Sequence, residues 1–180
     1  MENLDAIINE VGFKIANILD ENLINKLLGV LANDGVYAMW VYAADKIDIN
    51  FKIDDDTISI KRPKLFELIL LLKPLLNKVY QTCFIDGLLQ KEENKINELT
   101  QNIEKINKVD LSKEEKNKRI IKLKKEIVNY ITQEFIRETS IYLQIISNDI
   151  YKLLFLKQLL EKTLVYARYH AKALKVSEYE

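Results

Sequence analysis

The sequence is poor in the residues that interrupt helices and in those that build metal or redox sites. Four glycines and two prolines in 180 residues leave few positions for the turns of a sandwich or barrel, which favours a helical fold. The single cysteine, Cys83, excludes an intramolecular disulfide; we expect a reducing compartment and a small buried thiol. The single histidine, His170, cannot complete the usual set of about four zinc ligands, so no metal or other cofactor is expected.

The sequence also shows no long apolar run and no pattern typical of a secretory signal peptide. The longest runs, 36–44 and 68–72, are too short to span a bilayer. The first residues carry Glu2 and Asp5 where a signal peptide needs positive charge. We therefore expect a soluble, cytoplasmic protein without a membrane partner.

What the sequence does contain is a core-forming fraction of 48% apolar residues, enough for one domain. The pattern predicts an all-α fold over residues 1–180. We expect a compact helical bundle, a projecting antiparallel helical hairpin at about 90–130, and a small extended or β-hairpin lobe near 47–60.

Helical spacing predicts the elements of the bundle. Residues 4–31 form one or two helices, with Asp20 as a cap where the second begins. A helix that is apolar on nearly every side follows at 35–46, capped by Asn33 or Asp34. Another begins near Pro63 and is expected to continue to about Gln90 with a bend at Pro74. The last helix spans about 149–175.

The segment between residues 47 and 60 has the period of a strand. Apolar residues alternate with polar ones at Ile47, Ile49, Phe51 and Ile53. The three aspartates at 54–56 suggest a calcium or magnesium ligand set, but the EF-hand glycine and distal glutamate are missing, so a turn is the stronger interpretation.

The expected hairpin has an apolar seam on its first helix and a capped second helix. Its seam consists of Ile96, Leu99, Ile103 and Ile106. Ser112 and Glu115 have the spacing of a capping box, so the second helix should begin there and run toward Ser147.

The net charge of zero conceals an uneven distribution. Residues 1–60 carry 11 acidic and 4 basic side chains, whereas residues 61–180 carry 16 acidic and 23 basic ones. Such asymmetry suggests a polyanion-binding region or head-to-tail packing of copies, although solvated helix faces explain most single charge runs.

The basic residues concentrate in three clusters. They are a helix-start cluster (Lys61, Arg62 and Lys64), an arm-tip cluster (Lys113, Lys116, Lys118, Arg119, Lys122, Lys124 and Lys125), and a terminal stripe along one line of the last helix, interrupted by Glu161 (Lys157, Arg168, Lys172 and Lys175). Tyr166 and Tyr169 are expected to lie away from the stripe. RNA binding here would therefore be contact with phosphates rather than stacking on bases.

No catalytic constellation is evident. There is no phosphate-binding glycine loop, nucleophile elbow or Cys–His pair. The signature of small helical ribonucleases, an Arg and a His with four to six residues between them, has no counterpart, because Thr163, Leu164 and Val165 stand where the arginine would be. Glu134 and Glu138 share a helix face without a histidine at ligand spacing, so we expect no enzyme.

Two segments resemble one family. Residues 33–46 (NDGVYAMWVYAADK) and 161–174 (EKTLVYARYHAKAL) resemble segments of the small all-helical subunit of type III-B (RAMP module) CRISPR RNA-guided effector complexes. The resemblance implies a non-catalytic antiviral-defence subunit that stacks with further copies of itself and with other effector-complex subunits, and that contacts guide RNA and target RNA through basic helix faces.

By position, Arg168 matches the first residue of the family's basic pair, whereas Tyr169 replaces the second and Lys172 stands where the family is often acidic. The candidate RNA contacts are Lys157, Arg168, Lys172, Lys175, Lys61, Arg62, Lys64, Lys118, Arg119 and Lys122. The alternative is a protein-only structural adaptor that associates through its helical arm. An unrecognised enzyme is the third and weakest interpretation.

Overall fold

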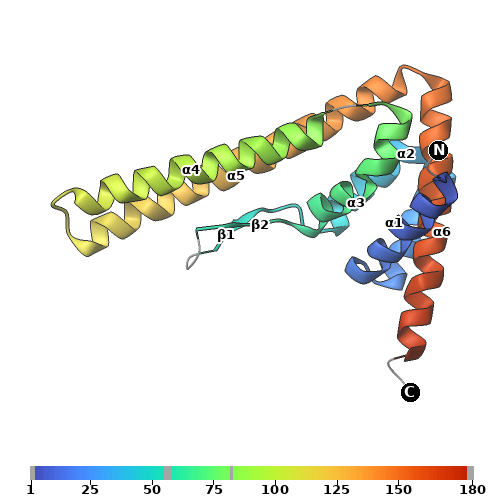
Figure 1. Cartoon of the computed structure of the whole chain (residues 1–180), viewed down its shortest axis with the longest axis horizontal. Helices are drawn as coiled ribbons and strands as arrows, with labels where there is room; N and C mark the ends of the chain where they lie inside the picture. Colours follow the sequence, from blue (N-terminus) through green and yellow to red (C-terminus); the bar gives the residue numbers. More distant parts are fainter. Residues whose placement is uncertain (1–2, 55–57, 82, 178–180) are drawn as a thin grey trace. The chain divides into compact units, whose positions relative to one another are not determined.

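The computed structural model describes residues 3–54, 58–81 and 83–177, and these form six α-helices and one two-stranded antiparallel sheet (Figure 1). The all-α prediction is confirmed. Contacts within the chain gather in two compact units, one of residues 1–48, 64–82 and 142–180 and one of residues 49–63 and 83–141. The prediction of one domain over 1–180 stays a prediction, and each unit is described by itself.

The first unit is built around its last helix. Helix α6 (Ile150–Ser177) packs against α1 (Leu4–Ile18), α2 (Glu21–Lys46) and α3 (Lys64–Val79). Helix α6 supplies the buried side chains of Leu156, Leu160, Leu164, Ala167 and Ala171. Asp149 caps this helix by accepting from the amides of Tyr151 and Lys152, at 3.1 and 3.2 Å.

Helices α1 and α2 meet where the sequence predicted a cap. The side chain of Asp20 accepts from the amide of Leu23 at 2.9 Å, which confirms Asp20 as the N-cap of α2. The expected start of a further helix at Asn33 or Asp34 is wrong in detail, because both residues lie inside α2. The break comes at Gly35, whose φ of 87° and ψ of −174° belong to a region that residues with a side chain rarely adopt.

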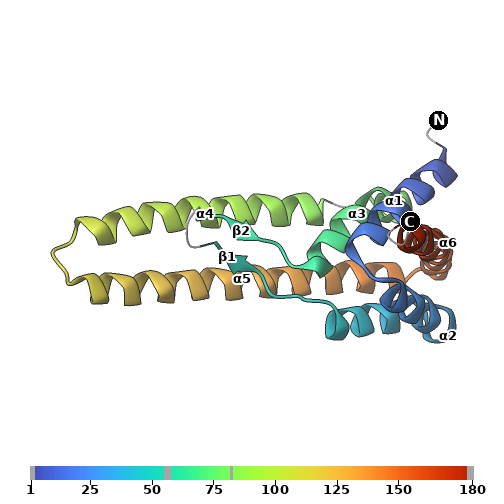
Figure 2. The same cartoon turned by 90° about the horizontal axis from the view of Figure 1, so that it is seen from below.

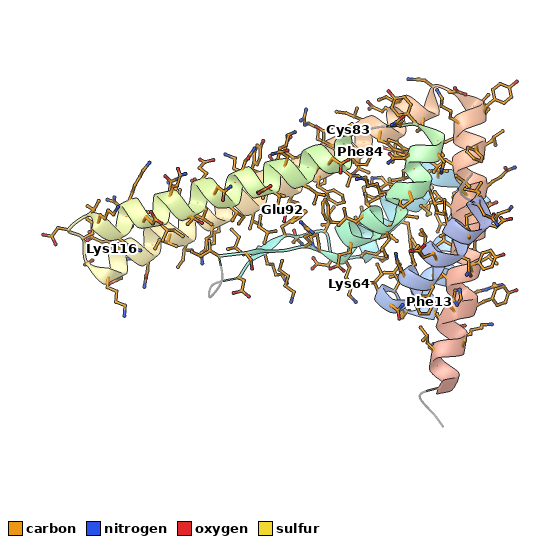
Figure 3. All side chains as sticks on the ribbon, in the orientation of Figure 1. Phe13, Lys64, Cys83, Phe84, Glu92 and Lys116 are labelled. Atoms are coloured by element: carbon orange, nitrogen blue, oxygen red, sulfur yellow. The ribbon has the colours of Figure 1, made fainter. Side chains whose placement is uncertain are left out.

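The chain leaves α3 earlier than predicted. Helix α3 starts directly after Pro63, tolerates Pro74 in its interior and ends at Val79; α4 (Phe84–Lys108) is a separate helix. The prediction of a single bent helix to Gln90 is therefore wrong. Cys83 precedes α4 and is exposed (Figure 3), so the expected buried thiol is wrong as well.

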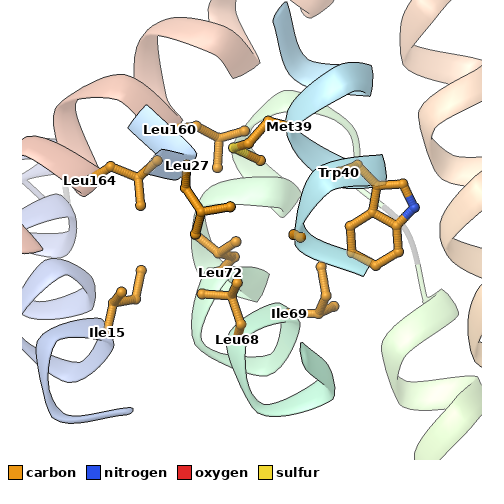
Figure 4. A pocket seen from close by; sticks show the side chains of 10 residues that line it. Ile15, Leu27, Met39, Trp40, Leu68, Ile69, Leu72, Leu160 and Leu164 are labelled. Atoms are coloured by element: carbon orange, nitrogen blue, oxygen red, sulfur yellow. The ribbon is translucent and has the colours of Figure 1, made fainter. Parts of the chain in front are cut away.

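The core of the first unit encloses a small apolar cavity of about 30 Å³ (Figure 4). Leu27, Trp40, Leu72 and Leu160 are among its lining residues, and none of the side chains that line it is charged. A space of this size and lining stays dry. It is a packing defect rather than a ligand pocket.

Helix α2 is the one helix in the described chain with the length and apolar composition to cross a membrane. Six of its side chains are buried in the first unit, from Ile24 to Ala43, and α6 packs along it. Core helices of soluble proteins meet the same two criteria, so length and composition do not indicate a span here.

The second unit is the predicted helical hairpin with its small lobe. Helix α4 and the part of α5 (Lys113–Ser147) up to Ile141 run side by side in both views (Figures 1 and 2). Strands β1 (Lys52–Ile53) and β2 (Ile60–Lys61) pair antiparallel, with Ile53 opposite Ile60. The predicted lobe is therefore a two-stranded hairpin. Its expected turn at 54–56 lies mostly outside the described residues.

The lobe contacts both helices of its own unit. Phe51 and Phe135 are both buried, and their rings meet edge to face with centroids 6.1 Å apart. Arg62, just after β2, binds the buried carboxylate of Glu92 on α4. An aromatic contact and an ion pair thus help to anchor the lobe.

The hairpin turn carries the predicted capping box. The amide of Glu115 donates to Oγ of Ser112 at 3.2 Å, and the amide and hydroxyl of Ser112 donate to the Glu115 carboxylate at 3.2 and 2.9 Å. In the seam, Leu99 is fully buried while the other three residues are half-buried. Between Leu99 and Ile127 no side chain is buried, so the outer part of the hairpin has little core of its own.

Candidate nucleic-acid interface

The terminal stripe begins with Lys157, which is bonded inside the first unit. Its Nζ donates to the carbonyl of Ala32 at 3.0 Å and lies 3.6 Å from Glu161. Ala32 precedes the break at Gly35, where the carbonyls at the end of a helical segment lose their partners. Lys157 therefore acts as a C-terminal cap for the first segment of α2.

The stripe ends with two lysines that share one carboxylate. Nζ of Lys175 donates to Glu21 at 3.0 Å, and Nζ of Lys172 lies 3.9 Å from the other oxygen of Glu21. The Glu21 side chain is only 19% exposed, whereas both lysines are more than half exposed. Three of the four stripe cations thus contact α2, and the stripe serves packing within the unit.

Arg168 differs from the other stripe residues. Its Nε is buried without a hydrogen-bond partner, and its guanidinium lies 5.1 Å from the ring centroid of Tyr169. This cation–π contact shows that the expectation of tyrosines remote from the stripe is wrong for Tyr169. Helical spacing placed the two on different sides of α6, but long neighbouring side chains still reach one another.

The helix-start cluster does not present three free cations. Lys61 and Lys64 are exposed, but Lys61 belongs to β2 in the second unit and Lys64 opens α3 in the first. Arg62 is committed to Glu92, since its Nε lies 3.0 and 3.2 Å from the two carboxylate oxygens (Figure 3 labels Glu92). Glu92 is 7% exposed, so this pair supports the lobe rather than a solvent-facing site.

Most cations of the arm-tip cluster are exposed. Lys118 and Lys122 have side chains that are 74% and 79% exposed, and Arg119 and Lys125 are exposed too. Lys118 and Lys122 pair with carboxylates one turn away on the same helix, Glu114 at 2.8 Å and Glu126 at 4.0 Å. Such exposed pairs are weak and easily exchanged for another anion.

Lys116 belongs to this cluster by sequence but has a structural role. Its Nζ donates to the carbonyl of Asn107 at 3.0 Å, near the end of α4 (Figure 3). It thereby closes the turn between the two arm helices. Lys113, Lys118, Arg119, Lys122 and Lys125 are exposed at this end of α5, and we call the last four, which follow one another along the helix, the arm rail.

A charge network ties α4 to α5 in the second unit. Lys91 binds Glu134 and lies 3.4 Å from Glu138, while Arg137 binds both glutamates at 2.9 Å. The hydrogen bond from Arg137, and then the one from Lys91, lower the pKa of Glu134 below its ordinary value. The hydrogen bond to Glu134 raises the pKa of Lys91. Sequence spacing indicated that the two glutamates share a helix face. It could not indicate Lys91 as their partner, because helical spacing relates residues within one helix and Lys91 lies on α4.

The described residues hold no group of three or more Cys, His, Asp or Glu side chains arranged for a metal ion. Asp55 and Asp56 of the aspartate run lie outside that part of the chain. The carboxylates of the charge network face cations instead of a vacant centre. The side chains of this region therefore support the packing of the hairpin.

Comparisons with protein-family models, with curated proteins and with solved structures return no match for this chain.

Proposed function

We propose that the chain is a non-catalytic subunit of an RNA-guided, RNA-targeting ribonucleoprotein, and that it binds RNA phosphates through the arm rail. The observation that carries this proposal is the exposure of the rail cations together with the weakness of their pairing. Residues 113–125 contain seven basic and two acidic side chains, so this end of α5 has a strongly positive field.

The geometry of the rail suits a backbone ligand. Lys118, Lys122 and Lys125 follow one another at helical spacing on one face and cover about 10 Å of helix axis. Lysine is a flexible point charge that binds phosphate without reading a base edge. Sequence would then be read by base pairing between guide and target, as in other RNA-guided systems.

The placement in a type III-B effector complex rests on the resemblance of residues 33–46 and 161–174 to the small subunit of those complexes. In that setting, the protein partners would be other effector subunits and further copies of this chain, in the cytoplasm. Within the stripe, Lys157, Lys172 and Lys175 already contact α2, so the rail is proposed as the main phosphate contact.

The test is the salt dependence of binding to an RNA duplex of about 20 bp. Neutralising two rail cations, as Lys122→Gln with Lys125→Gln, should weaken binding by the full-length protein. It should also reduce the slope of log affinity against log salt by about two, because each of the two lysines would no longer neutralise a phosphate. Fluorescence anisotropy at several salt concentrations measures both quantities.

A matched control removes the same charge elsewhere. Lys26 and Lys46 are exposed on α2 and lie outside the three basic clusters, so Lys26→Gln with Lys46→Gln should leave the slope close to that of the native protein. The proposal fails if the native chain does not bind the duplex at low salt, or if the rail variant keeps the native slope.

The protein-only adaptor is the second candidate, and exposed aliphatic residues on the arm favour it. Ile121 and Ile136 of α5 are 53% and 43% exposed. An adaptor would self-associate or capture another protein through these residues. Sedimentation of the native protein and of Ile121→Asn, both without RNA, separates the two candidates. An adaptor should assemble as its concentration rises, and Ile121→Asn should weaken that assembly.

A further inference from the structure

Aromatic and cationic side chains gather where α1 meets α6 in the first unit. We call this surface the aromatic–cation patch; it consists of Phe13, Lys162, Tyr166, Arg168, Tyr169 and His170. Three of its rings are well exposed, at 46% for Phe13, 40% for Tyr166 and 58% for Tyr169. The arm rail uses none of these residues.

The patch is held in place by a close contact between its two helices. A Cβ on Gly12 would lie 2.9 Å from Cβ of Tyr166 and 3.1 Å from backbone atoms of Thr163 and Ala167. The backbone of α1 therefore rests on α6 beside the Tyr166 side chain. The rings of the patch project from a rigid crossing rather than from a mobile loop.

The next residue of α1 extends the aromatic surface toward His170. The rings of Phe13 and His170 meet edge to face, with centroids 5.3 Å apart and an interplanar angle of 86°. Nε2 of His170 lies 3.0 Å from Oδ1 of Asn9, a residue one turn earlier on α1. Phe13 is thus oriented by a neighbour while almost half of its surface stays open.

The cations of the patch alternate with its rings. Lys162 is one turn before Tyr166 and is 63% exposed, with Asp5 of α1 at 3.9 Å as a weak partner. The guanidinium of Arg168 lies over the ring of Tyr169. From Lys162 to Lys175 the helix carries no carboxylate, so the charge of this stretch complements an anion.

We propose that the aromatic–cation patch binds a single-stranded stretch of RNA, with unpaired bases stacked on Tyr166 and Tyr169 and phosphates near Lys162 and Arg168. This rests on the proposed function, because it takes RNA as the ligand, and it adds a second site with a different preference. Exposed rings flanked by cations are the arrangement that binds single strands without reading their sequence.

The test compares the full-length protein with ring-removal and ring-retaining variants on a labelled oligouridylate of about 12 nucleotides. Tyr166→Ala with Tyr169→Ala should weaken binding by about tenfold or more, because each stacked base contributes a substantial part of the affinity. Tyr166→Phe with Tyr169→Phe should bind as the native protein does, because phenylalanine retains the stacking face.

Tyr151→Ala is the matched control on the same helix. Tyr151 is 83% exposed and lies outside the patch, so its removal should leave the affinity unchanged. If the alanine pair lowers the melting temperature, Lys162→Gln gives an independent readout at an exposed position. It should reduce the salt slope for oligouridylate by about one, and an unchanged slope overturns the proposal.

The duplex probe separates this inference from the proposed function. If the native protein binds the duplex, and Tyr166→Ala with Tyr169→Ala binds oligouridylate as strongly as the native protein does, only the patch proposal is overturned. Failure of the native chain to bind either probe overturns both. An alanine pair that keeps its RNA affinity but sediments as a smaller species than the native protein also overturns the patch as an RNA site, and it assigns the rings to a protein contact.

Discussion

Gly12 of α1 and Tyr166 of α6 approach so closely that a single methyl group on Gly12 would lie 2.9 Å from Cβ of Tyr166. Real Cβ atoms essentially never come so near, and the adjacent backbone at Thr163 and Ala167 cannot swing aside as a flexible side chain would. The contact fixes the distance between two helices whose faces form the core of the first unit.

Replacing this glycine should therefore weaken the fold. Gly12→Ala gains about 0.5–1 kcal/mol from helix propensity but must separate the helices, and overpacking of this kind typically costs about 1–3 kcal/mol. We expect a net fall in the free energy of unfolding, measured by urea denaturation. Gly29→Ala in α2 is the control, because a Cβ there meets nothing within 4 Å, and it should raise stability by about 0.5–1 kcal/mol. Equal stabilisation by both would contradict the close contact.

Glu134 should make the free energy of unfolding depend on pH in the acid range. Arg137 and Lys91 lower its pKa in the folded state, so the unfolded chain binds the proton more readily. Its contribution is complete above the unfolded pKa of about 4.3 and is lost as the pH falls through the lower folded pKa. Glu134→Gln should therefore be less stable than the native protein at pH 7, and the difference should shrink by pH 3.

Urea unfolding at the two pH values measures that difference. Glu93→Gln, at an exposed position of α4, serves as the control for removing a carboxylate. The difference in the free energy of unfolding between the native protein and Glu134→Gln is the decisive quantity. If it stays constant from pH 7 to pH 3, the charge of Glu134 is not stabilised by its partners.

Arg62 should matter to the fold through Glu92. Arg62→Ala leaves a carboxylate that is 7% exposed without this partner. We expect a loss of about 1–3 kcal/mol, which is less than the about 3–5 kcal/mol of a fully buried pair because the Arg62 side chain is 40% exposed. Adding Glu92→Leu should restore much of the loss, since it removes the stranded charge. Thermal and urea unfolding of the two single variants and the double variant give the coupling. If the effects of the two single variants on the free energy of unfolding simply add in the double variant, the ion pair is not the cause of the loss.

Local signals in the sequence predicted local structure well. Asp20 and the Ser112–Glu115 pair cap helices as expected, because a cap depends on residues three positions apart. Pro63 directly precedes α3, where its fixed φ and missing N–H suit the start of a helix. The break between α3 and α4 was missed, since it falls at residues without glycine or proline while the apolar spacing continues on both sides.

The candidate site was harder to predict because partners distant in sequence decide which cations are available. Lys157 finds the carbonyl of Ala32, 125 positions away, and Lys175 finds Glu21, 154 positions away. Helical spacing predicted these lysines on one line but could not show that α2 lies beneath them. The contact of Arg168 with Tyr169 was missed for a different reason, since face assignments ignore the reach of long side chains.

The absence of buried side chains between Leu99 and Ile127 has a consequence for the arm in solution. Helices without a packed face are only marginally stable in water, and regions with few buried contacts open at a free energy well below that of global unfolding. Amide protons at the tip should therefore exchange with solvent sooner than those beside Phe135. A polyanion bound to the rail would slow that exchange. The affinity of the polyanion would then include the entropic cost of ordering the helices that it touches.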